Sequence, residues 1–218
     1  MTVQVKICGI NSAEAADAAV RAGADFGGLV FHSKSPRNLS LEAGRSLADR
    51  LRGRLRLAAL VADEDDAAIA AAVAAVQPDY LQLHGHETPE RTSQTRARFA
   101  LPVIKAIAVA EAADFAQVPA YETVADILLF DAKPAGGALR PGGHGAAFDW
   151  QLLRRRRFTR PWLLAGGLTQ ANVARAIAAS GATGVDVSSG VETAPGVKNA
   201  QLIVDFVAAA RNLAQVVS

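Results

Sequence analysis

Cysteine is nearly absent from this chain of 218 residues, which contains a single one, Cys8. One cysteine cannot form an intramolecular disulfide, so the sequence gives no support for an oxidising compartment. No apolar stretch reaches the ~20 residues that a membrane-spanning helix needs, and no basic segment followed by an apolar one begins the chain. We therefore expect a cytoplasmic protein without a membrane partner.

Charge of one sign is also in short supply. The 23 Lys and Arg residues nearly balance the 21 Asp and Glu residues, which leaves a formal net charge of +2. So small an excess does not favour a nucleic-acid partner. The one dense basic run, Arg154 to Arg157, would suit a polyanion, but the balance elsewhere favours a solvated helix end on the exterior.

What the sequence does contain is a regular alternation of short apolar runs and Ala-rich helical patterns. The apolar runs are mostly continuous, which is typical of parallel strands buried on both faces. We expect strands at 3–8, 26–31, 55–62, 80–84, 102–108, 127–131, 162–165 and 185–187. We expect helices at 11–22, 41–51, 65–76, 89–99, 111–118, 148–155, 169–180 and 199–216, the first opened by a capping box of Asn11 and Glu14.

Eight such units predict an α/β protein with a single (β/α)8 TIM barrel as one domain over residues 1–218. A doubly wound open sheet is the competing architecture, but no Gly-x-Gly-x-x-Gly pattern follows the first strand. The longest loop, 133–147, is rich in Gly and Pro and follows the sixth strand. Such a loop is either a lid over a site or a simple insertion.

Two residues that can move protons end strands of the predicted barrel, where barrel enzymes carry their chemistry. Cys8 ends the first strand, where its thiolate would act as nucleophile or base unless the side chain is only a small buried hydrophobe. Asp131 ends the sixth, where it would donate a proton as a carboxylic acid, or else anchor a loop or cap a helix. Lys6 shares a strand side with Cys8 and would either favour the thiolate or pack in the barrel core.

Phosphate binding is indicated by the segments after the last two strands, Gly166-Gly167 and Ser188-Ser189-Gly190. Their backbone N–H and hydroxyl groups suit a phosphate, and these two loops often bind one in a barrel. We therefore expect a phosphorylated small molecule as the partner.

Two further polar residues lie at other predicted strand ends and loops. Arg37 lies in the loop after the second strand, and His84 ends the fourth strand. Arg37 would bind a second anionic group such as a carboxylate, or else is an ordinary surface arginine. His84 would be a base or hold a neighbouring loop. No carboxylate cluster accompanies His84 and His86, so we expect no metal.

Seven motifs, taken in order along the chain, resemble those of the phosphoribosylanthranilate isomerase family of tryptophan biosynthesis. They cover essentially the whole length, which makes the resemblance far more specific than one short pattern. The motifs are Lys6-Ile7-Cys8-Gly9-Ile10, Ser35-Pro36-Arg37, Leu81-Gln82-Leu83-His84-Gly85, Leu128-Leu129-Phe130-Asp131, Gly142-Gly143 with Gly145 ahead of Phe148-Asp149-Trp150, Leu164-Ala165-Gly166-Gly167-Leu168, and Gly184 to Glu192 with Pro195-Gly196.

The resemblance implies an Amadori rearrangement of N-(5-phosphoribosyl)anthranilate to 1-(2-carboxyphenylamino)-1-deoxyribulose 5-phosphate, with no cofactor. Asp131 would be the general acid at the ribose ring oxygen, and Cys8 the general base at C2. Arg37 would hold the anthranilate carboxylate. The remaining expected substrate-binding residues are Gln82, His84, Gly166, Gly167, Asp186, Ser188, Ser189 and Gly190. The family resemblance leaves a monomer and a homodimer both open.

Other phosphosugar barrels are the nearest alternatives. Indole-glycerol-phosphate synthase would need a lysine acid and glutamates at its strand ends, and Lys105 is the inward candidate on the fifth strand. A histidine-pathway isomerase is expected to carry an aspartate in place of Cys8. An epimerase and a bifunctional isomerase with relaxed substrate choice are further alternatives. A non-catalytic phosphate-binding module would need neither Cys8 nor Asp131.

Overall fold

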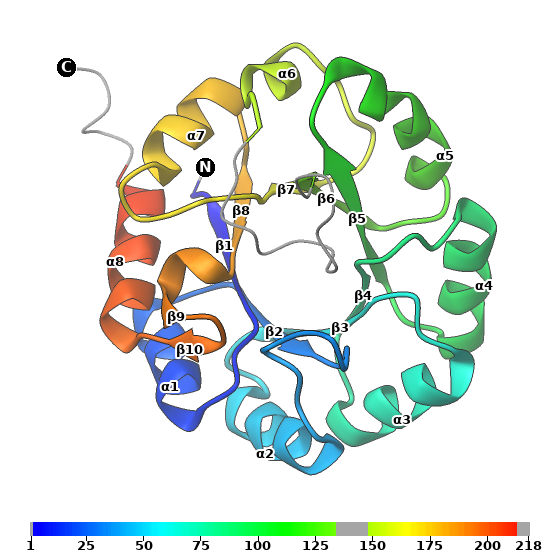
Figure 1. The fold of residues 1–218 in the computed structure, drawn as a ribbon, viewed down its shortest axis with the longest axis vertical. Coiled ribbons are helices and arrows are strands. Elements are labelled where there is room, and N and C mark those ends of the chain that lie inside the picture. Colours follow the sequence, from blue (N-terminus) through cyan, green and yellow to red (C-terminus); the bar gives the residue numbers. More distant parts are fainter. Residues whose placement is uncertain (1, 134–147, 213–218) are drawn as a thin grey trace.

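The computed structural model describes residues 2–133 and 148–212, which form a closed barrel of parallel strands inside a ring of helices (Figure 1). The strand order follows the chain from β1 to β8, and β8 pairs with β1 to close the barrel. The predicted TIM barrel is confirmed.

The strands and helices alternate as the sequence predicts. The barrel strands are β1 (Gln4–Cys8), β2 (Phe26–Val30), β3 (Arg56–Val61), β4 (Tyr80–Leu83), β5 (Val103–Val109), β6 (Ile127–Ala132), β7 (Trp162–Leu164) and β8 (Gly184–Val187). The α-helices are α1 (Ala13–Ala22), α2 (Leu41–Leu51), α3 (Asp66–Val76), α4 (Pro89–Phe99), α5 (Val118–Glu122), α6 (Gln151–Arg154), α7 (Val173–Ser180) and α8 (Ala200–Arg211).

Side-chain caps decide where several helices begin. Ser12 has an extended backbone and accepts a hydrogen bond from the N–H of Ala15, which opens α1. The predicted capping box of Asn11 and Glu14 is therefore wrong, because the Asn11 amide donates instead to the carbonyl of Gly196, 2.7 Å away. Ser40 and Thr88 cap α2 and α4 in the same way as Ser12, and both helices have the predicted bounds.

Four short elements differ from the prediction. The expected helix over 111–118 is a 3₁₀ helix, η1 (Ala112–Gln117), which leads into α5. Another 3₁₀ turn, η2 (Ser189–Val191), and an antiparallel pair, β9 (Glu192–Ala194) and β10 (Val197–Lys198), follow β8. Elements of two or three residues are too short to leave a periodic pattern. The run from Arg154 to Arg157 is exposed at the end of α6, as expected.

The barrel interior is filled by alternate residues of the strands. One buried cluster joins side chains from five strands across the barrel: Phe26, Ala58, Ile104, Ala106, Ile127, Leu129, Leu163 and Ala165. Because Ile104 and Ala106 point inward, Lys105 between them points outward. The expectation that Lys105 faces the interior is wrong, and its Nζ instead lies 2.7 Å from Glu87 Oε2.

Some predicted segments fall outside the described residues. The loop 133–147 is described only at Lys133, so its glycines 142, 143 and 145 and the predicted lid lie outside, and so do residues 213–216 of the last predicted helix. Within the described ranges, no helix is both long and apolar enough to cross a membrane.

Candidate active site

A pocket opens where the barrel strands have their carboxyl ends. Both predicted catalytic residues, Cys8 at the end of β1 and Asp131 near the end of β6, line it. Both side chains are buried except for the small area that faces the pocket. Seven of the predicted binding residues also line it: Arg37, His84, Gly166, Gly167, Asp186, Ser188 and Ser189. The barrel therefore brings together residues that are far apart in the sequence.

Gln82 and Gly190, the other two predicted binding residues, lie behind the pocket lining. Gln82 is fully buried inside the barrel, next to His84. Gly190 packs against the carbonyl of Leu168, so closely that a side chain there would collide with it. Their placement predicts an indirect role, in which Gln82 orients His84 and Gly190 lets the loops after β7 and β8 approach each other.

The environment of Cys8 is set by an ion pair inside the barrel. Lys6 Nζ lies 2.7 Å from Asp186 Oδ1, and both side chains are buried. Burial alone would lower the pKa of Lys6, but Asp186 and Cys8 together outweigh it and raise that pKa, so Lys6 remains charged. Burial raises the pKa of the Cys8 thiol; the ammonium of Lys6 opposes this rise, and Asp186 adds to it. Without substrate, Cys8 is therefore held as a thiol at neutral pH.

Asp131 stands at the end of a row of three polar side chains, which also includes Gln82 and His84. His84 Nε2 lies 3.1 Å from Asp131 Oδ2, and the Gln82 amide nitrogen lies 2.9 Å from His84 Nδ1. The other Asp131 oxygen accepts a hydrogen bond from the N–H of Ala132. In this arrangement His84 Nδ1 accepts a hydrogen bond from the Gln82 amide, and His84 Nε2–H donates one to the Asp131 carboxylate.

Arg37 reaches the pocket but already has a partner in the chain. Its Nε and Nη2 donate to the two carboxylate oxygens of Glu192, at 2.7 and 2.8 Å. Lys198 binds the same carboxylate at 2.8 Å and also donates to the Ser188 carbonyl. Burial alone would raise the pKa of Glu192, but Arg37 and Lys198 overcome this and lower it. Sequence reasoning missed the partnership, although Glu192 lies within a quoted motif.

The part of the pocket that is lined by the segments after β7 and β8 is suited to an anion. Gly166 and Gly167 line the pocket and both have positive φ, at +87° and +61°, a conformation that glycine adopts readily. Since neither residue has a side chain, their backbone can face a ligand directly. Ser188 and Ser189 line the same side, at the start of the 3₁₀ turn η2. Exposed N–H groups and hydroxyls of this kind bind phosphate oxygens well.

The part of the pocket that is lined by residues of β1, β2 and β3 is partly apolar. Cys8, Val30 and Leu60 form one buried cluster at the mouth, and Ala62 also lines the pocket. His32, which sequence reasoning did not single out, also lines the pocket. Among the described residues there is no group of three or more His, Cys, Asp or Glu side chains that could hold a metal ion.

Comparison with known proteins gives consistent matches over nearly the whole chain. The family model described as N-(5'-phosphoribosyl)anthranilate (PRA) isomerase matches residues 5–209. A protein of that name from Beijerinckia indica is 52% identical over 211 residues, which cover 97% of this chain and 95% of the relative.

Solved structures agree with these sequence matches. The phosphoribosyl anthranilate isomerase of Thermotoga maritima is 37% identical with a TM-score of 0.85, over 95% of this chain and 98% of the other. A structure of a phosphoribosyl anthranilate isomerase in complex with reduced 1-(o-carboxyphenylamino)-1-deoxyribulose 5-phosphate is 35% identical, with a TM-score of 0.82 and the same coverage.

Proposed function

Since the chain belongs to the N-(5'-phosphoribosyl)anthranilate isomerase family and is an isomerase of tryptophan biosynthesis, we propose how it acts. Its substrate is N-(5-phosphoribosyl)anthranilate, and its product is 1-(2-carboxyphenylamino)-1-deoxyribulose 5-phosphate. Asp131 is the general acid and Cys8 the general base. The observation that carries this proposal is that both groups line one pocket together with Arg37 and with the glycine and serine segments after β7 and β8.

In the first step, Asp131 protonates the ribose ring oxygen. The bond between that oxygen and C1 breaks, and the nitrogen lone pair forms an iminium with C1. The row of Gln82, His84 and Asp131 supports this role because it suits both protonation states of the acid. With the Gln82 amide turned over, Gln82 Oε1 accepts a hydrogen bond from His84 Nδ1–H, and His84 Nε2 accepts one from protonated Asp131.

In the second step, Cys8 acts as its thiolate, after it has given the thiol proton to solvent. The thiolate removes the proton from C2 and gives an enolamine. This intermediate becomes the ketone when C1 gains a proton and the C2 hydroxyl loses one, so the substrate neither gains nor loses atoms. Asp131 has then lost one proton and Cys8 has gained one, and exchange with solvent restores both. A thiol with a raised pKa is a stronger base once it ionises, and Lys6 stabilises the thiolate electrostatically.

The two ends of the substrate are held by the two ends of the pocket. The phosphate binds the N–H and hydroxyl groups of Gly166, Gly167, Ser188 and Ser189. The anthranilate ring lies against the apolar wall of Val30 and Leu60, with its carboxylate toward Arg37. Asp186 does not contact the substrate and acts through its ion pair with Lys6.

We place the enzyme in the cytoplasm, because a reducing compartment keeps Cys8 a free thiol.

The alternatives fit the barrel less well. A synthase acid from β5 is unsupported, because Lys105 points away from the pocket and binds Glu87. A passive phosphate-binding module gives no reason for Cys8 and Asp131 to share a pocket. The test is to follow the loss of fluorescence of freshly prepared N-(5-phosphoribosyl)anthranilate with purified protein. Catalysed loss at micromolar substrate supports the proposal, and a rate equal to that of the buffer control contradicts it.

A further inference from the structure

His32 is a pocket residue to which the mechanism above gives no role. It follows β2 and lines the pocket together with Arg37 and the apolar wall. Its Nδ1 lies 3.0 Å from Glu64 Oε1. Its Nε2 is buried and has no hydrogen-bond partner among the described residues. A buried ring nitrogen without a partner is costly unless a ligand supplies one.

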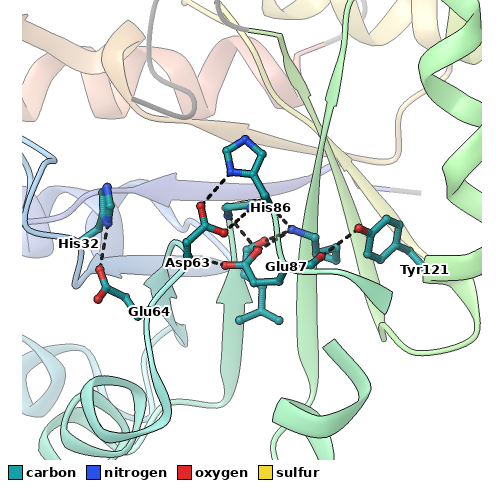
Figure 2. Close-up of polar contacts among 9 residues, drawn as sticks. His32, Asp63, Glu64, His86, Glu87 and Tyr121 are labelled. Atoms are coloured by element: carbon teal, nitrogen blue, oxygen red, sulfur yellow. Dashed lines mark hydrogen bonds and ion pairs between the residues drawn. The ribbon is translucent and has the colours of Figure 1, made fainter. Parts of the chain in front are cut away.

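Glu64, the partner of His32 (Figure 2), belongs to a loop after β3 that is held by several contacts. Its own backbone carbonyl accepts a hydrogen bond from Arg91 Nη2 at 3.2 Å. The preceding Asp63 has a left-handed backbone at φ +55°. Its N–H donates to Glu87 Oε1, and its carboxylate accepts from the backbone and ring nitrogens of His86.

Glu87 in turn is anchored outside the barrel. Its Oε2 lies 2.7 Å from the buried Nζ of Lys105, and its carbonyl accepts a hydrogen bond from Tyr121 at 2.9 Å. Figure 2 shows this chain of contacts leading from Tyr121 and Glu87 to Asp63, next to the pair of His32 and Glu64. Glu64 therefore presents its carboxylate from a rigid loop, so the His32 ring is oriented in advance.

The contacts of Arg37 explain what a second donor would do here. Glu192 occupies Nε and Nη2 of Arg37, the two donors best arranged for a bidentate carboxylate contact. A ligand carboxylate must therefore be satisfied partly by another group. His32 and Arg37 both belong to the loop after β2, whereas the glycines and serines that suit the phosphate follow β7 and β8.

We propose that His32 Nε2 donates a hydrogen bond to the carboxylate on the substrate's aromatic ring and so helps to select carboxylated substrates. The inference rests on the proposed function. With that carboxylate bound, the ring lies between two carboxylates, and an N–H on each ring nitrogen donates to one of them. Glu64 is then a positioning residue, since it contacts the ring and not the substrate.

The test compares two ligands that differ only in the carboxylate. One is the reduced product analogue, reduced 1-(2-carboxyphenylamino)-1-deoxyribulose 5-phosphate, and the other is its phenyl counterpart without the carboxyl group. Calorimetry gives the ratio of their dissociation constants for wild type, His32→Phe, His32→Gln and Glu64→Gln. The phenyl ligand is the matched control, because it retains every contact except those of the carboxylate.

We expect wild type to prefer the carboxylated ligand, and His32→Phe to lower that preference about 10-fold, as loss of a charge-assisted hydrogen bond does. His32→Gln restores an N–H donor and should recover most of the preference. Glu64→Gln leaves the lining intact and should lower it about threefold.

Two results would overturn the inference: an unchanged preference in both His32→Phe and Glu64→Gln, or an equal loss of affinity for both ligands. A wild type that does not convert N-(5-phosphoribosyl)anthranilate would instead overturn the proposed function. The two failures are therefore distinguishable.

Discussion

His84 places its Nε2 3.1 Å from Asp131 Oδ2, and the hydrogen bond joins the ends of two strands on opposite sides of β5. Gln82 fixes the other ring nitrogen from within the barrel. The carboxyl that we propose as the proton donor is therefore held in place by the His84 ring. This relationship gives His84 a positioning role that sequence alone left open.

His84→Ala should lower kcat about 10–100-fold, because Asp131 loses the group that orients it. KM should change less than threefold if the ring does not itself bind substrate. Added imidazole, which fits the space that the side chain leaves, should restore part of kcat. A loss without imidazole rescue, or one confined to KM, would argue that His84 acts only as a structural or binding residue.

The alkylation of Cys8 should depend on pH as a buried thiol does. Burial disfavours the thiolate and raises the pKa, so the rate with iodoacetamide should still be rising above pH ~8.5, the pKa of free cysteine. Asp186→Asn removes a negative charge that raises the pKa of Cys8, so this variant should react faster at a given pH. Lys6→Met should react more slowly. A wild-type rate that levels off below pH ~8 would contradict this description.

Gly166 and Gly181 form a matched pair for testing the loop after β7. Both have positive φ, at +87° and +76°, but a Cβ on Gly166 would lie 2.5 Å from the backbone nitrogen of Ala132, whereas one on Gly181 would meet nothing within 4 Å. Gly181→Ala should cost ~1 kcal/mol in urea unfolding and leave KM unchanged.

Gly166→Ala should cost ~2 kcal/mol or more, since backbone next to Asp131 must move as well. It should also raise KM through the phosphate end of the pocket. Equal effects of the two alanines on stability and KM would show that the close approach at Gly166 has no consequence.

Most of the barrel could be predicted from the sequence because each strand and helix carries its own pattern. The continuous apolar runs and the polar residues that open α2 and α4 are local features, and those helices have the predicted bounds. Asn11 was misassigned as a cap because its real partner, Gly196, lies at the other end of the chain. Lys105 was misassigned because a one-residue shift in register reverses which side of a strand faces the barrel.

The candidate site, too, contains features that could be predicted from the sequence and features that could not. Strand ends are local features, so Cys8, Asp131 and the glycine and serine segments could be found from the sequence. The contacts between loops could not. Two such contacts depend on how neighbouring loops fold over the barrel mouth: one joins Arg37 to Glu192 and the other joins His32 to Glu64. The distances between such loops cannot be derived from a single sequence.

The most direct measurement is the turnover of N-(5-phosphoribosyl)anthranilate by wild type, Cys8→Ala and Asp131→Asn. Binding of the reduced product analogue serves as a check that the pocket is intact. We predict that each variant binds the analogue within about threefold of wild type and loses at least ~100-fold in kcat, the range expected for positioned acid and base groups. A Cys8→Ala or Asp131→Asn variant with nearly normal turnover would contradict the assignment of base or acid.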